Sequence, residues 1–191
     1  MAKVAIFVAN GFEDTEMVAT CDVLRRAEKM FSGSFPVVDI VSINDSKHVK
    51  GAWNINVIAD KVISEIDFNN YDCLVLPGGR TGVDHLKESE ILMNALENHA
   101  KQNKIIAAIC AAPEILGKLK LVDNVEITHY PGCDKDLDNA IKKPHIAAIS
   151  DGNFITGSSI GAALQFGLQI VDHFTSTEQM LKLHDSLVFN Y

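Results

Sequence analysis

The sequence has 191 residues, a formal net charge of −8 and an apolar fraction of 47%. This length predicts one domain over residues 1–191 with a full hydrophobic core. The acidic balance argues against a nucleic-acid partner, because phosphate binding needs a basic face. No stretch approaches the roughly 20 apolar residues of a membrane span, and no signal peptide is expected, so we expect no membrane partner.

The four cysteines are scattered along the chain and form no C-x-x-C pair. This spacing does not suit a disulfide framework, and it favours free thiols in a cytoplasmic protein. Cys133 follows His129 by four residues in a polar loop, where we expect it to be exposed, but two further metal ligands have no evident source. We therefore expect neither a metal nor another cofactor.

Apolar runs and helical patterns alternate along the first half of the chain. Residues 3–9, KVAIFVA, are typical of a strand buried on both faces. From Asp14 the period changes to that of a helix, which closes with basic residues up to Lys29. Further along, the patterns predict a strand at 36–43, a hairpin-like surface arm at 48–60, a strand at 72–79, and helices at 82–89 and 90–103.

The second half continues this alternation. Residues 105–109 predict another buried strand, a helix follows from Pro113, and residues 125–130 predict a strand before a polar loop. The remaining predicted elements are strands at 145–150 and 153–158 and helices at 160–174 and 176–189. Strands that alternate with helices imply βαβ units and a mostly parallel sheet in an α/β fold.

Cys110 lies between the apolar strand and the helix that Pro113 begins, within the sequence AAICAAP. Proline fits the first turn of a helix, and the flanking alanines allow close backbone packing. This is the pattern of a nucleophile elbow with Cys in place of Ser. The helix N-terminus favours the thiolate, so we expect the pKa of Cys110 to be lowered.

Three strand ends carry distinctive residues: NGFEDTE after the first, PGGRTG after the third, and CAAP at the elbow. Ligands of parallel sheets bind beyond the carboxyl ends of the strands, so these segments predict one crevice. Within it we expect Cys110 as nucleophile, with one carboxyl of the first segment protonated beside the sulfur. The N–H groups of Gly79 and Ala111 are candidate oxyanion donors, and His129 is a candidate base or proton carrier.

Each candidate also has a purely structural interpretation. Cys110 would then be an inert core thiol, as many buried cysteines are. Glu16 would only complement the helix dipole together with Glu13 and Asp14. His129 would be a histidine hydrogen-bonded at a strand end, and Gly79 would only make a tight turn.

AAICAAP, with VLPGG upstream and GFEDTE near the N-terminus, closely resembles the ThiJ/PfpI superfamily over essentially the full chain. The branch is that of the human parkinsonism-associated protein deglycase and its bacterial relatives. The resemblance implies a flavodoxin-like three-layer α/β sandwich with a mostly parallel sheet, similar to class I glutamine amidotransferases, and a homodimer packed partly through the first helix. It also implies Cys110 as the nucleophilic, oxidation-sensitive cysteine, Glu16 rather than Glu13 as the protonated acid, and His129 as the nearby histidine.

One segment departs from the family's pattern. The family often places an Arg or Gln before Gly-Pro-Gly in a late loop, whereas residues 157–161 of this chain read GSSIG. The loop therefore lacks a side chain that binds anions, which puts such a contribution in doubt.

Two classes of function use these residues. The first is a glyoxalase or deglycase that acts on 2-oxoaldehydes such as methylglyoxal, or on their early adducts, through a Cys110 hemithioacetal. The second is a non-enzymatic redox sensor or stress chaperone that depends on oxidation of Cys110. A peptidase or amidase and a thiazole-biosynthesis protein are less favoured alternatives. The sequence does not separate the first two, because the same residues serve both.

Overall fold

A seven-stranded sheet forms the middle layer of the computed structural model, which describes residues 2–189. The strand order is β10-β11-β7-β6-β1-β2-β5, and every neighbouring pair is parallel except β10 with β11. The strands are β1 (Lys3–Val8), β2 (Val37–Ser42), β5 (Lys61–Val62), β6 (Cys73–Leu76), β7 (Ile105–Ile109), β10 (Ala148–Asp151) and β11 (Phe154–Gly157).

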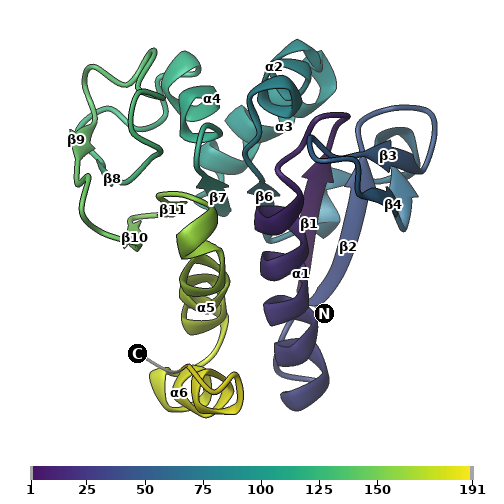
Figure 1. Cartoon of the computed structure of the whole chain (residues 1–191), viewed down its shortest axis with the longest axis vertical. Helices are drawn as coiled ribbons and strands as arrows, with labels where there is room; N and C mark the ends of the chain where they lie inside the picture. The colour runs from purple at the N-terminus through teal and green to yellow at the C-terminus, as the bar shows by residue number, and fades with distance from the viewer. Residues whose placement is uncertain (1, 190–191) are drawn as a thin grey trace.

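Helices cover both faces of this sheet, which gives three layers (Figure 1). α1 (Asp14–Met30) and α5 (Ala163–Phe174) run side by side over one face, with α6 (Thr177–Ser186) beside them. The opposite face is covered by α2 (Arg80–Glu88), α3 (Glu90–Lys101) and α4 (Pro113–Lys118). The α/β fold with a mostly parallel sheet is therefore confirmed.

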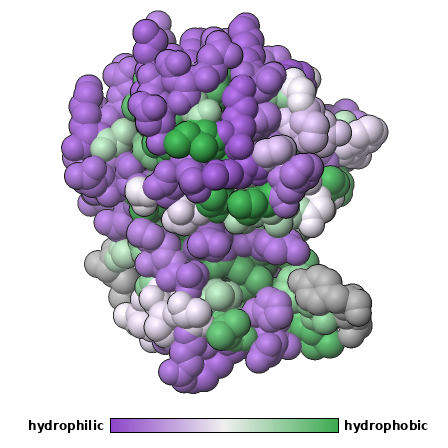
Figure 2. Space-filling model, turned by 90° about the vertical axis from the view of Figure 1, so that its left-hand side faces the viewer, coloured by the Kyte–Doolittle hydropathy of each residue, from purple (hydrophilic) through white to green (hydrophobic). Residues whose placement is uncertain are grey.

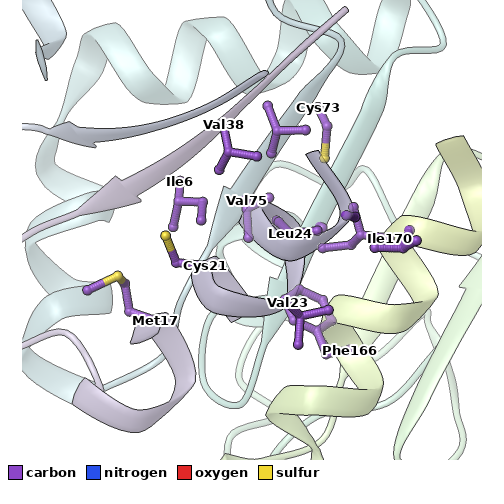
Figure 3. Close-up of a cluster of buried hydrophobic side chains, with 14 of the residues drawn as sticks. Ile6, Met17, Cys21, Val23, Leu24, Val38, Cys73, Val75, Phe166 and Ile170 are labelled. Atoms are coloured by element: carbon purple, nitrogen blue, oxygen red, sulfur yellow. The ribbon is translucent and has the colours of Figure 1, made fainter. Parts of the chain in front are cut away.

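The alternation of β1 explains the two cores. Val4, Ile6 and Val8 face α1 and α5, while Ala5 and Phe7 face the opposite helices. All five are fully buried, because successive side chains of a strand point to opposite faces and both faces are covered here. Figure 3 shows the first core, where side chains of α1 and α5 pack against the sheet.

The shorter elements differ from the prediction around residues 125–145. The predicted strand at 125–130 is reduced to β8 (Glu126–Ile127), which pairs with β9 (Ile141–Lys142) in the segment expected to be a loop. The pairing stops there because the N–H of Thr128 donates to the hydroxyl of Thr156 instead of a strand carbonyl.

The face of the molecule in Figure 2 is mostly hydrophilic, with hydrophobic residues reaching the surface in small groups.

The remaining short elements are single turns and a hairpin. The arm predicted at 48–60 is the hairpin of β3 (His48–Lys50) and β4 (Asn56–Ile58). Three 3-10 turns lie at Ile63–Glu65, Phe68–Asn70 and Ile160–Ala162, and the last helix ends at Ser186, earlier than predicted. None of the helices in the described part of the chain combines the length and apolar character needed to cross a membrane.

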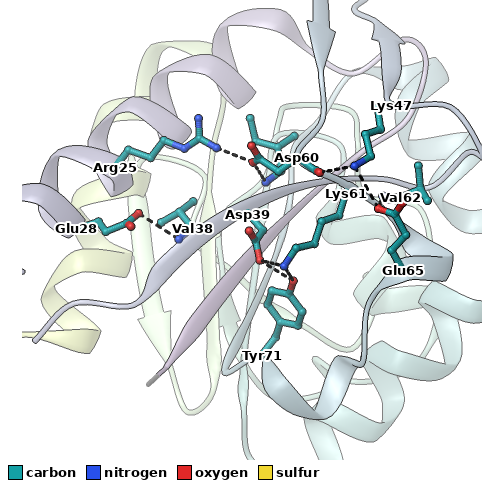
Figure 4. A network of polar contacts seen from close by, with 11 residues as sticks. Arg25, Glu28, Val38, Asp39, Lys47, Asp60, Lys61, Val62, Glu65 and Tyr71 are labelled. Atoms are coloured by element: carbon teal, nitrogen blue, oxygen red, sulfur yellow. Dashed lines mark hydrogen bonds and ion pairs between the residues drawn. The ribbon is translucent and has the colours of Figure 1, made fainter. Parts of the chain in front are cut away.

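A polar network fixes the edge of the sheet at β2 and β5 (Figure 4). Asp39 of β2 accepts hydrogen bonds from Lys61 and from the hydroxyl of Tyr71, each at 2.7 Å. Asp60 accepts the N–H of Ile40 at 2.7 Å and pairs with Arg25 of α1. These contacts hold the short edge strand β5 to the sheet and to α1. The residues of this network are far from Cys110 in the sequence.

Candidate active site

A cavity of about 430 Å³ lies where the carboxyl ends of β1, β6 and β7 meet, as the sequence predicted. This volume is within the usual range of small-molecule sites. A larger cavity of about 740 Å³ lies beside the end of α1, but no cysteine or histidine lines it. The smaller cavity is lined by Glu13, Glu16, Trp53, Gly79, Arg80, Cys110, Ala111, Tyr130, Cys133 and Ile160.

Cys110 occupies a sharp turn between β7 and α4, as expected of an elbow. Its φ of 66° lies in the left-handed region, which is costly for a residue with a side chain. The turn is held because the N–H of Cys110 donates to the carbonyl of Gly157 and its own carbonyl accepts the N–H of Tyr130, both at 2.9 Å. The strained turn thereby presents the thiol to the cavity.

Glu16 reaches the sulfur from the first turn of α1. Its carboxyl is 1% exposed, and Oε2 accepts the N–H of Gly78 at 2.9 Å. Gly78 is needed here, because a Cβ at this position would lie 2.5 Å from Oε2 of Glu16 and 2.6 Å from Cβ of Cys110. The sequence does not reveal this role, since a Gly-Gly pair does not indicate which side chains will approach it.

Glu16 and Cys110 affect each other's protonation. Burial raises the pKa of Glu16 from 4.5 to about 7, although hydrogen bonds with Cys110 and with the N–H of Gly78 oppose this. Burial also raises the pKa of the Cys110 thiol, the charge of Glu16 raises it further, and the N–H of Ala111 lowers it. The expected lowering of the thiol pKa is therefore wrong, because burial and Glu16 outweigh the short α4. The two groups titrate as a pair that releases one proton near neutral pH and retains the other.

The two candidate oxyanion donors both line the cavity. The N–H of Ala111 is directed at the sulfur of Cys110. The N–H of Gly79 has no acceptor among residues 2–189. Gly79 has a φ of 90°, and a Cβ there would lie 2.4 Å from the carbonyl oxygen of Gly11, so no other residue fits this turn.

His129 lies next to the cavity rather than in its lining. Its Nδ1 is 2.9 Å from the carbonyl oxygen of Tyr130, and the side chain is largely buried. Tyr130, which the sequence analysis did not single out, contributes its side chain to the lining instead. Among the described residues, His129 makes no hydrogen bond to the Cys110 thiol.

The tip of the β3–β4 hairpin closes one side of the cavity. Asp14, 2% exposed, accepts the N–H groups of Trp53 and Ile55 at 2.9 Å each and so fixes this tip. The indole N–H of Trp53 donates to Glu13 at 3.2 Å. The sequence analysis interpreted this segment as a surface arm, because nothing local indicates that it folds back onto α1.

A charged cluster lies beside the cavity and reaches its lining through Arg80 and Cys133. Glu114, 1% exposed, accepts hydrogen bonds from both terminal nitrogens of Arg80 and from Lys87. Arg80 also contacts the sulfur of Cys133 at 2.8 Å. Cys133 is buried, at 9% exposure, and is not the exposed loop cysteine that was expected. Within the described residues, no group of three or more His, Cys, Asp or Glu side chains is arranged to hold a metal.

The DJ-1/PfpI family model matches residues 2–173. The chain belongs to the DJ-1/PfpI family.

Named relatives in the family span several kingdoms. Protein DJ-1 homolog B of Arabidopsis thaliana is 33% identical over 183 residues, which is 95% of this chain but only 40% of that protein's length. The glutathione-independent glyoxalase DJ-1 of Schizosaccharomyces pombe is 28% identical and is covered to 98%, as is this chain. Among solved structures, oxidised Toxoplasma gondii DJ-1 is 30% identical, with a TM-score of 0.88 and full coverage of both chains.

Proposed function

We propose that this protein is a cysteine-dependent glyoxalase that converts 2-oxoaldehydes such as methylglyoxal into 2-hydroxycarboxylates, with early glyoxal adducts of amino groups as further substrates. The observation that carries the proposal is the Cys110 thiol in a cavity beside a buried carboxyl with a pKa raised to about 7. A carboxyl that titrates near neutral pH is suited to taking up and returning a proton. The glyoxalase name of the S. pombe relative supports the same class of reaction.

The proposed reaction begins with attack of Cys110 on the aldehyde carbon. A C–S bond forms while the thiol proton passes to the Glu16 carboxylate, and the N–H groups of Gly79 and Ala111 stabilise the resulting oxyanion. The proton on the former aldehyde carbon then moves to the neighbouring carbon through an enediol, with Glu16 as the proton carrier. The product is a thioester of the 2-hydroxy acid, and water cleaves it to release the acid and restore the thiol.

The raised thiol pKa is compatible with this sequence, because the reactive pair carries one proton in total. A thiol beside an ionised Glu16 and a thiolate beside a protonated Glu16 are the same protonation state of the pair. The Cys110 thiol can therefore pass its proton to Glu16 while it attacks the substrate. It does not need to be a thiolate beforehand.

Turnover of methylglyoxal to lactate, with Cys110→Ala as the inactive variant, tests the proposal. Cys21→Ala is the matched control, because Cys21 is a buried thiol of α1 outside the catalytic pair. We expect wild type and Cys21→Ala to form lactate without glutathione and Cys110→Ala to form none. Equal lactate formation by wild type and Cys110→Ala would refute the proposal.

Redox sensing through Cys110 is the second candidate. It is supported by the solved T. gondii relative, which is described as oxidised, and by the partial exposure of the Cys110 thiol. Peroxide treatment followed by mass spectrometry of the Cys110 peptide tests it. Uptake of two oxygens at Cys110 in a protein without methylglyoxal turnover would favour this candidate over the glyoxalase.

We also propose a homodimer that packs through α1 and the β3–β4 hairpin. Exposed apolar side chains gather there, with Val18 at 45%, Ile55 at 51% and Ile58 at 67% exposure. Light scattering should give twice the 20.9 kDa of one chain, and Val18→Glu should shift the mass towards the monomer. The control Leu181→Glu changes an equally exposed apolar residue on α6 and should leave the mass unchanged.

A further inference from the structure

We propose that the cavity prefers 2-oxoaldehydes that carry a carboxylate at their far end, and that Arg80 is the residue that binds this carboxylate. The inference rests on the proposed function for the reaction at Cys110 and adds the class of substrate. It starts from the charged cluster on the cavity wall, which the proposed chemistry at Cys110 and Glu16 does not use.

The charges of this cluster do not cancel. Arg80 and Lys87 contribute two positive charges, and Glu114 contributes one negative charge. Burial alone would raise the pKa of Glu114, but hydrogen bonds from Arg80 and Lys87 outweigh it and lower the pKa. Glu114 is therefore ionised at neutral pH, and one positive charge remains in excess.

The excess charge faces the cavity through Arg80. The Arg80 side chain is 51% exposed and lines the cavity, whereas that of Lys87 is only 13% exposed and does not line it. Two hydrogen bonds to Glu114 and one to Cys133 use three of the five N–H groups of the guanidinium. The other two have no partner among residues 2–189, so Arg80 retains donors for a ligand.

Arg80 is also held in place before a ligand arrives. The paired contact with Glu114 fixes the plane of the guanidinium, and the sulfur of Cys133 fixes one edge. A fixed cation loses little conformational entropy on binding, which strengthens the contact with an anion. A flexible surface arginine would not have this advantage.

The size and charge of the remaining cavity agree with an elongated anionic substrate. The volume of about 430 Å³ leaves room beyond methylglyoxal when its aldehyde is at Cys110. Glu13 also lines the cavity, and its Oε1 has no partner in the described residues, so a carboxylate is repelled from that side. Among the described residues that line the cavity, Arg80 is the one with a positively charged side chain.

The kinetic test compares 4,5-dioxopentanoate with its methyl ester, which keeps the 2-oxoaldehyde but has no negative charge. We expect wild type to prefer the acid by roughly tenfold in kcat/KM, as a charge-assisted contact implies. Arg80→Gln should abolish this preference, mainly through KM, when the ratio of acid to ester kcat/KM is compared within each protein. Arg80→Lys should restore part of it because it keeps the charge. The control Lys118→Gln removes an exposed charge of α4 outside the lining and should change nothing.

A binding test separates this inference from the proposed function. Titration calorimetry on Cys110→Ala compares 2-hydroxyglutarate, the product expected from the acid, with lactate. We expect 2-hydroxyglutarate to bind roughly tenfold more tightly and Arg80→Gln to remove the difference. Loss of aldehyde turnover with this preference intact would refute only the glyoxalase. Equal binding of the two acids, or a preference that survives Arg80→Gln, would overturn the role of Arg80.

Discussion

Glu16 and Glu114 are two carboxyls in the first turns of their helices, each only 1% exposed, yet their pKa values shift in opposite directions. Glu16 accepts one backbone N–H and pairs with no cation in the described chain, and burial raises its pKa to about 7. Glu114 is buried as deeply, but Arg80 and Lys87 lower its pKa. Burial raises the pKa of Glu16, whereas at Glu114 the hydrogen bonds and charges of Arg80 and Lys87 outweigh the effect of burial.

The difference separates a group that exchanges protons from one that holds a permanent charge. Glu16 gains and loses its proton within the physiological range, which suits chemistry. Glu114 stays ionised and positions a guanidinium. Three predictions test whether the two carboxyls are as different as this comparison states.

The largest expected effect is on turnover. Glu16→Gln should lower methylglyoxal kcat/KM by roughly 10² to 10⁴-fold, because an amide cannot take up a proton. In wild type, kcat/KM should rise as pH increases through about 7, where the pair releases its first proton. Initial rates across this range check both statements.

Glu13→Gln is the control, since it makes the same change three residues earlier, at another residue of the lining. It should retain most of the activity. If Glu13→Gln is inactive and Glu16→Gln is active, the acid has been assigned to the wrong residue. If neither matters, the catalytic role of this turn is wrong and redox sensing is favoured.

The second effect is on stability against pH. Because the pKa of Glu16 is raised on folding, the native state holds a proton that the unfolded chain releases between pH 4.5 and about 7. The free energy of unfolding of wild type should therefore fall across this window by about 3 kcal/mol from this group. Glu16→Gln lacks this dependence. Urea denaturation of both proteins across the window measures the difference, and parallel curves would contradict the raised pKa.

The third and smallest effect concerns Glu114→Gln. It should destabilise the protein by about 1–2 kcal/mol at neutral pH, a value reduced for the exposure of Arg80. Since the pKa of Glu114 is lowered, the advantage of wild type is present above pH 4.5 and disappears as pH falls through the lowered folded value. Methylglyoxal turnover should be unaffected. A large loss of turnover would mean that Glu114 also takes part in the chemistry.

Much of the fold and the centre of the site could be predicted from the sequence, because their signals are local. Apolar runs identified the central strands, and Pro113 after Cys110 identified the elbow. The choice of Glu16 over Glu13 came from family resemblance, since spacing alone does not distinguish two acids in one turn.

The walls of the cavity could not be predicted, because they depend on contacts between distant parts of the chain. Arg80 meets Glu114 across 34 residues, and Asp14 meets Trp53 across 39. Neither pair has a local signature, and the lowered thiol pKa was wrongly expected because burial is not visible in a motif. β8 and β9 were missed for a similar reason, since each has only two residues.

At Gly78 the residue type is restricted by the space around it and not by a reactive side chain. Gly33 has a φ of 85° and open space around it, so its backbone angle is what favours glycine there. At Gly78 the backbone is not left-handed, and what excludes a side chain is the space that Glu16 and Cys110 already occupy. In a saturation library, position 78 should tolerate as little variation as the nucleophile, although the glycine contributes only its N–H. A single methyl group there would separate acid from thiol without altering either one.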